Sequence, residues 1–258
     1  MPQARFTLPT TRHDGSHVAT LNAATAQDVD DAVRAAEHAR QQPAWANLKP
    51  HERAGLLHKM AAGIRERDEK LAQLQRLDNG KPIKETRALV ASAAGTFQFF
   101  AAACETLEDA ITPQRGDSIT MSVHEPPGVV GAITPWNSPI ASEAQKLAPA
   151  LAAGCAVVFK PAEITPRMAI ELARIAQAAG VPDGIVSVLP GKGFVVGEAL
   201  VRHPLIKRIA FTGGTNVGMG IARIGADKLM PTSLELGGKS PAIVCKDADL
   251  DHAVAGVL

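Results

Sequence analysis

Two apolar segments rich in β-branched residues limit the fold of this chain more than any other feature. Residues 128–133 and 155–160 each stop close to a Pro beside polar side chains, as buried parallel strands do where they present residues to a site. Residues 142–154, which lie between them, are rich in Ala and Leu at helical spacing and end at a Gly, as a helix with a C-terminal stop does. Together these segments predict a β-α-β unit.

The same alternation continues toward the carboxyl terminus. Residues 185–190 and 206–211 are further strand candidates, and residues 195–203 and 217–228 follow them as helix candidates. This order predicts an α/β fold with a Rossmann-like, doubly wound parallel sheet. Its ligand is expected across the carboxyl ends of the strands, where the intervening turns gather.

The first third of the chain is predicted to be mainly helical. Residues 1–24 contain a turn signal at Asp14-Gly15 and are expected to form an irregular or short-stranded arm. A helix should begin near Thr25, where Asp28 completes a weak capping box, and stop at Pro43.

The remaining elements are assigned from hydrophobic periodicity. Helices are expected over residues 49–77, 83–107 and 252–258, and strands over 119–125 and 240–245. The dense charge at residues 65–70 most simply predicts a solvated helix face.

Composition excludes several classes of protein. The 258 residues carry a formal net charge of +1 with 21% charged residues, so nothing predicts binding to nucleic acid or to an anionic membrane. The amino terminus lacks a signal-peptide core, and no continuous apolar run approaches the ~20 residues that cross a bilayer. The 3 Cys, at positions 104, 155 and 245, favour a reducing compartment. We therefore expect a cytoplasmic protein, and we assign no metal ligands.

Two glycine-rich turns follow predicted strands and open predicted helices. Gly191-Lys192-Gly193 and Gly213-Gly214, followed by Gly218, would direct bare N–H groups and a helix dipole at an anion. Neither turn is the G-x-G-x-x-G fingerprint. By spacing alone, an ordinary tight turn and a nucleotide site are equally compatible with them.

Four segments resemble signature motifs of the NAD(P)-dependent aldehyde dehydrogenase family, in the family's order: residues 133–137, 160–163, 211–218 and 234–239. The resemblance extends through the helical first third, at Trp45 and at residues 52–54, 64–67 and 77–82. It implies a helical lead-in of the nucleotide-binding domain over residues 1–107, an incomplete β oligomerisation segment over 108–127, an NAD-binding domain over 128–238, and the start of a catalytic domain over 239–258. Full-length relatives are expected to be homo-oligomers.

The resemblance also implies two catalytic residues. Asn137 resembles the donor that holds the oxyanion, and Glu235 resembles the general base that activates water. From the residues alone, Asn137 could instead cap the following helix. Glu235 could instead be an ordinary surface carboxylate.

For the cofactor, the resemblance implies NAD rather than NADP. Lys160 and Glu163 resemble the pair that binds the adenosine ribose, with Glu163 repelling a 2′-phosphate, although an exposed Lys/Glu pair at a strand end would look the same. Gly214 stands where many relatives carry a Ser whose hydroxyl reaches the pyrophosphate. The implied cofactor-binding residues are Ile133, Thr134, Pro135, Trp136, Lys160, Glu163, Gly193, Gly213, Gly214, Gly218, Leu236 and Gly237.

The nucleophile is the missing component. In the resembled family, the catalytic Cys follows the motif at 234–239 by a distance that places it beyond Leu258. Cys155 and Cys245 are predicted to be small core hydrophobes at strand ends, and Cys104 lies in an Ala-rich helix. We therefore expect an NAD-binding half of an aldehyde-oxidising enzyme that is inactive alone. The alternative is a non-catalytic nucleotide-binding or interaction module.

Overall fold

The computed structural model describes residues 7–11, 14–114 and 116–257. Its centre is a parallel sheet of five strands in the order β7-β6-β5-β8-β9. The strands are β5 (Val129–Ile133), β6 (Ala156–Lys160), β7 (Val186–Val188), β8 (Ile206–Gly213) and β9 (Thr232–Leu236). Numbered along the chain, this is the order 3-2-1-4-5, so the winding reverses between β5 and β8, as in a Rossmann fold. The predicted fold class is confirmed.

The two apolar segments that predicted the β-α-β unit form the middle of this sheet. All residues of β5 and β6 are buried, because helices cover both faces of the sheet. The connecting helix α6 (Pro139–Ala152) ends just before Gly154, whose φ of 81° is a left-handed conformation suited to glycine. The strands therefore point their carboxyl ends toward one edge of the domain.

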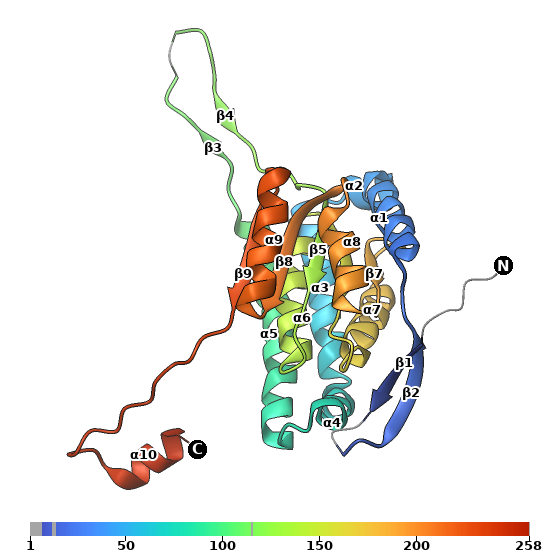
Figure 1. The fold of residues 1–258 in the computed structure, drawn as a ribbon. Helices are drawn as coiled ribbons and strands as arrows, with labels where there is room; N and C mark the ends of the chain where they lie inside the picture. The colour runs from blue at the N-terminus through green and yellow to red at the C-terminus, as the bar shows by residue number, and fades with distance from the viewer. Residues whose placement is uncertain (1–6, 12–13, 115, 258) are drawn as a thin grey trace, which may run out of the picture.

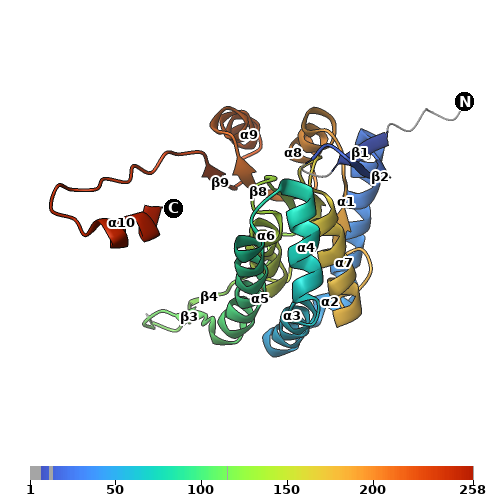
Figure 2. The same ribbon diagram turned by 90° about the horizontal axis from the view of Figure 1, so that it is seen from below.

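Helices form a layer on each side of the sheet, as Figures 1 and 2 show. On one side, α6 and α7 (Arg167–Ala179) lie next to the lead-in helices α3 (Pro50–Arg65), α4 (Asp68–Asn79) and α5 (Ile83–Thr106). On the other side lie α1 (Ala26–Gln41), α8 (Glu198–Arg202) and α9 (Thr215–Asp227). A π-helical turn, η1 (Gly193–Gly197), leads into α8. Helix α7 was not among the predicted elements, and the short helix α2 (Pro43–Ala46) begins at the predicted stop of α1.

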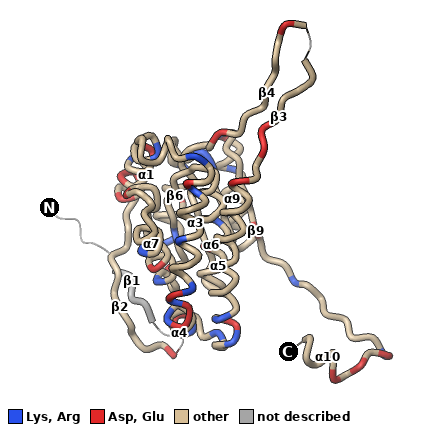
Figure 3. Tube along the Cα trace, turned by 180° about the vertical axis from the view of Figure 1, so that it is seen from behind, with Lys and Arg blue, Asp and Glu red and all other residues tan. Residues whose placement is uncertain are grey.

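The predicted capping box of α1 is present. The Thr25 N–H donates to Asp28 Oδ2 at 2.7 Å, and the Asp28 N–H donates to Thr25 Oγ1 at 3.2 Å. The single helix predicted over 49–77 is wrong, because the chain breaks between α3 and α4 at residues 66–67. Arg67 stabilises the break by donating from Nη1 to the Gly63 carbonyl at 2.9 Å. Figure 3 shows the charges gathered around α4.

Helix α5 has the length and apolar composition of a membrane-spanning segment, with a mean hydropathy of 1.3 over its most apolar window. A helix was predicted over residues 83–107, but no apolar run of membrane-spanning length. One stripe of it, including Val90, Ala94, Phe97 and Ala101, is buried, and the helix packs on α3 and α6. A core helix of a globular domain satisfies the same criteria of length and composition.

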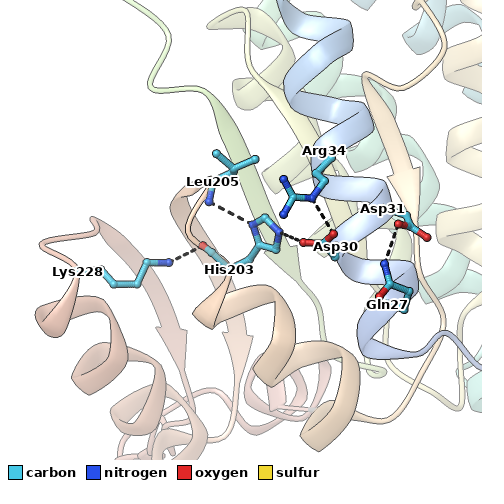
Figure 4. A network of polar contacts seen from close by, with 7 residues as sticks. All are labelled: Gln27, Asp30, Asp31, Arg34, His203, Leu205 and Lys228. Atoms are coloured by element: carbon cyan, nitrogen blue, oxygen red, sulfur yellow. Dashed lines mark hydrogen bonds and ion pairs between the residues drawn. The ribbon is translucent and has the colours of Figure 1, made fainter.

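A polar network ties α1 to the end of α8 (Figure 4). His203 is buried, its Nε2 lies 3.0 Å from Asp30 Oδ1, and its Nδ1 accepts the Leu205 N–H at 3.2 Å. Because Nδ1 is an acceptor, Nε2 carries the proton in neutral His203. Lys228, which follows α9, donates to the carbonyls of His203 at 2.7 Å and Val201 at 3.1 Å. The network therefore locks α8 between α1 and the end of α9.

Two β hairpins lie outside the central sheet. Strands β1 (Thr7–Thr11) and β2 (His17–Asn22) pair along the side of the domain, joined by the predicted turn. The second hairpin pairs β3 (Ala110–Ile111) with β4 (Met121–Ser122) and projects away from the body (Figure 1). The strand predicted over 119–125 is thus reduced to the two residues of β4, beside which the Thr120 carbonyl still accepts the Thr112 N–H at 3.1 Å.

The strand predicted over 240–245 is wrong. After β9, residues 237–249 contain no regular element and run away from the sheet to the exposed helix α10 (Leu250–Val257) (Figure 1). An apolar, β-branched segment forms a strand only where another strand offers hydrogen bonds, and none lies beside this one in the described chain. Cys245, predicted to be a core residue, is exposed.

Candidate functional site

A cavity of about 1090 Å³ lies at the carboxyl ends of β5, β6, β8 and β9. We call it the strand-end cavity. It contains the reversal point between β5 and β8, where doubly wound sheets hold their ligands. Every predicted site residue except Gly218 lines it: Ile133, Thr134, Pro135, Trp136, Asn137, Lys160, Glu163, Gly193, Gly213, Gly214, Glu235, Leu236 and Gly237.

Gly218 has a packing position instead. A Cβ atom on Gly218 would lie 2.4 Å from Leu236 Cδ2, so the missing side chain lets α9 approach β9. The structure therefore places Gly218 one layer behind the cavity wall and Leu236 between the two. This role follows from the position of Gly218 on the side of α9 that faces the sheet. The sequence alone does not show that position, because it depends on how α9 packs against β9.

Asn137 lies in an irregular segment between β5 and α6. Asn137 is exposed where it lines the cavity. Trp136 lines the cavity too, with 53% of its surface exposed. The residue at the N-cap of α6 is Ser138, which makes no side-chain capping bond. The alternative interpretation of Asn137 as the helix cap therefore has no support in the structure.

Lys160 is the last residue of the interior strand β6, and Glu163 follows three residues later. Only 3% of Lys160 is exposed, and its Nζ donates to the Pro161 carbonyl at 2.7 Å and lies 3.6 Å from Glu163 Oε2. Burial lowers the pKa of the Lys160 ammonium, and the neighbouring Glu163 opposes that shift. Glu163 Oε1 accepts the Gly193 N–H at 2.7 Å. The pair is thus a built part of the cavity wall, in contrast to the exposed pair that the sequence left open.

Glu235 reaches the cavity from the penultimate position of β9, opposite Thr212 of β8. Beneath it lies Lys146 of α6, a residue that the sequence analysis missed. Lys146 Nζ donates to Thr212 Oγ1 at 2.6 Å. Burial lowers the pKa of Lys146, and the Glu235 carboxylate raises it. A single Lys within an otherwise Ala- and Leu-rich helix was the available signal.

The two glycines at the start of α9 differ in the space available to a side chain. A Cβ on Gly213 would lie 2.5 Å from the Phe211 ring, whereas a Cβ on Gly214 would meet no atom within 4 Å. Gly214 is the N-cap of α9 and makes no side-chain cap bond. The first N–H groups of this helix therefore open onto the cavity with the positive end of the helix dipole, which favours an anion.

The apolar wall of the cavity was also missed. Val217, Ile221 and Ile224 line it at spacings of four and three residues along α9, so the helical period of residues 217–228 was a usable signal. Phe194 of η1 lines it too and is 71% exposed, with Lys192 Nζ 5.6 Å from its ring centroid. The cavity thus joins an apolar slot to a few polar groups, the usual composition of a ligand site.

None of the cysteines lines this cavity. Cys104 and Cys155 are buried and Cys245 is exposed on the segment after β9. Burial raises the pKa of the Cys155 thiol, which keeps it protonated and unreactive. Within the described ranges, no cluster of His, Cys, Asp and Glu has an arrangement that could hold a metal ion.

Strand order, helices on both faces and a cavity at the reversal point define a Rossmann-like α/β protein whose cavity lies where such folds hold dinucleotides. Residues 5–258 match the model of the Aldehyde dehydrogenase family. The chain belongs to this family.

The relatives agree in sequence and structure. The chain is 42% identical over 245 residues to a protein of Bacillus subtilis (strain 168) that is named as the aldehyde dehydrogenase DhaS. The match covers 95% of this chain and 50% of that protein. The NAD⁺ complex of an aldehyde dehydrogenase from Bacillus cereus is 39% identical with a TM-score of 0.93, over 97% of this chain and 52% of that one. A betaine aldehyde dehydrogenase from Staphylococcus aureus in complex with NAD⁺ is 32% identical, also at 0.93, over 97% and 51%. The chain spans about half the length of these relatives.

Proposed function

We propose that this chain binds NAD in the strand-end cavity and supplies an amide donor and a carboxylate base for the oxidation of an aldehyde to a carboxylate. One observation carries the proposal. Asn137, Lys160, Glu163 and Glu235 come from three different strand ends, far apart in sequence, and line one cavity. The matched family and the NAD⁺ complexes of its relatives support the same assignment.

The cavity suits a dinucleotide. Its volume of about 1090 Å³ is at the upper end of the range for ligand pockets. It has an anion-binding helix start at Gly214 and an apolar wall on α9. Its buried Lys160 and its carboxylate Glu163 are suited to hydroxyl groups of a ribose.

The proposed roles follow from these positions. Lys160 and Glu163 bind the adenosine ribose, the turn at Gly213-Gly214 faces the phosphates, and residues 133–136 contact the nicotinamide. NAD, when bound, supplies the hydride acceptor. Glu163 favours NAD over NADP, because a 2′-phosphate would meet a carboxylate already held by the Gly193 N–H.

The residues of this chain then have two tasks in the reaction. The neutral Asn137 amide donates to the oxygen on which negative charge develops. Glu235 accepts a proton from the attacking water, and Lys146 beneath it adds a positive charge to its surroundings. No cysteine lines the cavity, so we propose that residues 1–258 alone do not form the covalent intermediate that a thiolate nucleophile gives.

Calorimetric titration of NAD and NADP tests the cofactor assignment. Wild type should bind NAD roughly tenfold or more tightly than NADP, because like charges in a partly desolvated site cost on the order of a few kcal/mol. Glu163→Gln should lower the ratio of NAD affinity to NADP affinity. Glu198→Gln is the matched control: it removes a carboxylate from the same cavity wall, one that already pairs with Arg202 Nε at 2.9 Å, and should narrow it less. Equal affinities in wild type that neither substitution changes would contradict the assignment.

A further inference from the structure

Two side chains of α4 hold the backbone on both sides of Asn137. Asn79 Nδ2 donates to the carbonyl of Trp136 at 3.4 Å and to the carbonyl of Asn137 at 3.3 Å. Gln75 Oε1 accepts the N–H of Ile140 at 3.2 Å. Gln75 and Asn79 are four residues apart and therefore lie on the same face of the helix.

The segment that they hold has no regular structure of its own. Residues 134–138 belong to neither β5 nor α6, so the carbonyls of Trp136 and Asn137 are not paired by a ladder or a helix. Ile140 is the second residue of α6, where N–H groups lack an intrahelical partner. Gln75 and Asn79 thus bond backbone groups that secondary structure leaves open.

The two α4 side chains are themselves fixed. Gln75 is fully buried at 0% exposure. Asn79 Oδ1 accepts the Lys81 N–H at 3.1 Å, which turns its Nδ2 toward the segment. Between them, Asp78 forms a buried ion pair with Arg167 and so anchors α4 to the start of α7. The donor and the acceptor are therefore presented from a rigid support.

We propose that Gln75 and Asn79 form a loop clamp that positions Trp136 and Asn137 in the strand-end cavity. They are positioning residues: they act through the backbone and do not line the cavity. The inference rests on the proposed function insofar as Asn137 is the oxyanion donor. It makes α4 a functional part of the site, because a small displacement of an oxyanion donor removes much of its effect.

Fluorine NMR on protein labelled with 5-fluorotryptophan tests the clamp. The chain has 2 Trp residues. Trp136 lies in the clamped segment, and Trp45 lies at the opposite edge of the sheet, donating to the Gly154 carbonyl at 2.8 Å. Asn79→Ala and Asn79→Asp should shift or broaden the Trp136 signal and leave the Trp45 signal unchanged. Asn79→Asp keeps the acceptor for the Lys81 N–H and replaces the amide donor by a charged carboxylate oxygen, which repels the two carbonyls.

The matched control is Gln73→Ala on the same helix. Among the residues that the structure describes, the Gln73 amide bonds only within α4, to Glu69 at 2.8 Å, so both fluorine signals should stay in place. Gln75→Leu removes the other half of the clamp and should move the Trp136 signal in the same way as Asn79→Ala. If Asn79→Ala unfolds, both fluorine signals will collapse to the positions of the unfolded chain. The single variants Asn79→Asp and Gln75→Leu then test the clamp.

Nucleotide binding gives a second readout. The clamp variants should weaken NADH binding roughly three- to tenfold, the effect of a lost hydrogen bond or two, and leave the affinity for AMP unchanged, because AMP occupies only the adenosine end. A Trp136 signal at its wild-type position in all folded variants overturns the clamp. A shifted signal with unchanged NADH affinity overturns its functional role. A wild type that binds neither nucleotide overturns the proposed function, and the fluorine result still decides the clamp.

Discussion

The two ends of the strand-end cavity are built differently. At the end of β6, Lys160 is buried, and Glu163 is bonded to the turn at Gly193. At the end of β9, an edge strand, Glu235 and Leu236 are exposed. A central strand has neighbours and helices on every side, whereas an edge strand lacks a neighbour on one. Within the described residues, the end proposed to bind the cofactor is therefore closed by packed residues, while the end proposed for the chemistry is open.

The largest expected effect is on turnover. The purified 258-residue polypeptide should bind NAD but oxidise no simple aldehyde, because Asn137 and Glu235 have no thiolate to serve. Loss of the nucleophile from a cooperative catalytic set costs several orders of magnitude. The measurement is NADH formation at 340 nm with a panel of aldehydes. Turnover that disappears in Cys245→Ala would contradict this contrast between the two ends, because it would place a nucleophile at the open end.

The next largest effect is expected on the pH dependence of folding stability, through Glu143 of α6. Glu143 of α6 and Phe159 of β6 line the same small pocket. Both carboxylate oxygens of Glu143 are buried without a partner among the described residues. Burial raises the pKa of Glu143 well above its ordinary value, and Asp78 adds to this shift. The native state keeps a proton that the unfolded chain releases above about pH 4.5. The native state is therefore stabilised by this proton fully below that pH. The stabilisation is lost at about 1.4 kcal/mol per pH unit as the pH rises toward the pKa of Glu143 in the folded state.

Glu143→Gln removes this titration with little change in volume. Denaturant unfolding from pH 5 to pH 8 should show a stability that falls less steeply in the variant than in wild type. The variant should be the more stable protein at pH 8. Glu105→Gln, at an exposed position near the end of α5, is the control and should keep the wild-type slope. Parallel pH profiles for Glu143→Gln and wild type would refute the prediction.

A smaller effect is expected at β8, between the two ends. Gly214→Ser places a hydroxyl in open space at the N-cap of α9 and should strengthen NAD binding by up to about tenfold, the effect of one good hydrogen bond. Gly213→Ser puts a Cβ against the Phe211 ring and should weaken binding and lower the thermal midpoint. Calorimetry on both variants decides. Equal effects would show that the two glycines are interchangeable.

The smallest effect is expected at the open end. Glu235→Gln should change the affinity for NAD by less than about twofold, because an exposed carboxylate interacts weakly with a ligand in high dielectric. The same substitution at Glu163 should change the ratio of NAD to NADP affinity. If Glu235→Gln altered cofactor selectivity as strongly as Glu163→Gln, the division of the cavity into a binding end and a chemical end would be wrong.

The alternating strands and helices could be predicted from the sequence alone, and with them the carboxyl-terminal edge of the sheet where the cavity lies. Buried strands, helix periods and stops at Pro or Gly are written locally, because they reflect short-range sterics and the side to which each residue points. This is why β5, β6 and the capping box at Thr25 agree with prediction. The motif resemblance named residues that all line the cavity except Gly218, and it missed the apolar wall formed by α9.

Which of the local patterns have a partner in the fold could not be predicted from the sequence. Residues 240–245 have the pattern of a strand and lack one because no strand lies beside them. Lys146 beneath Glu235, Gly218 against Leu236, and Asn79 against the carbonyl of Asn137 each join segments separated along the chain. Such contacts depend on how whole elements pack, and a linear pattern does not record the distance between two segments that only folding brings together.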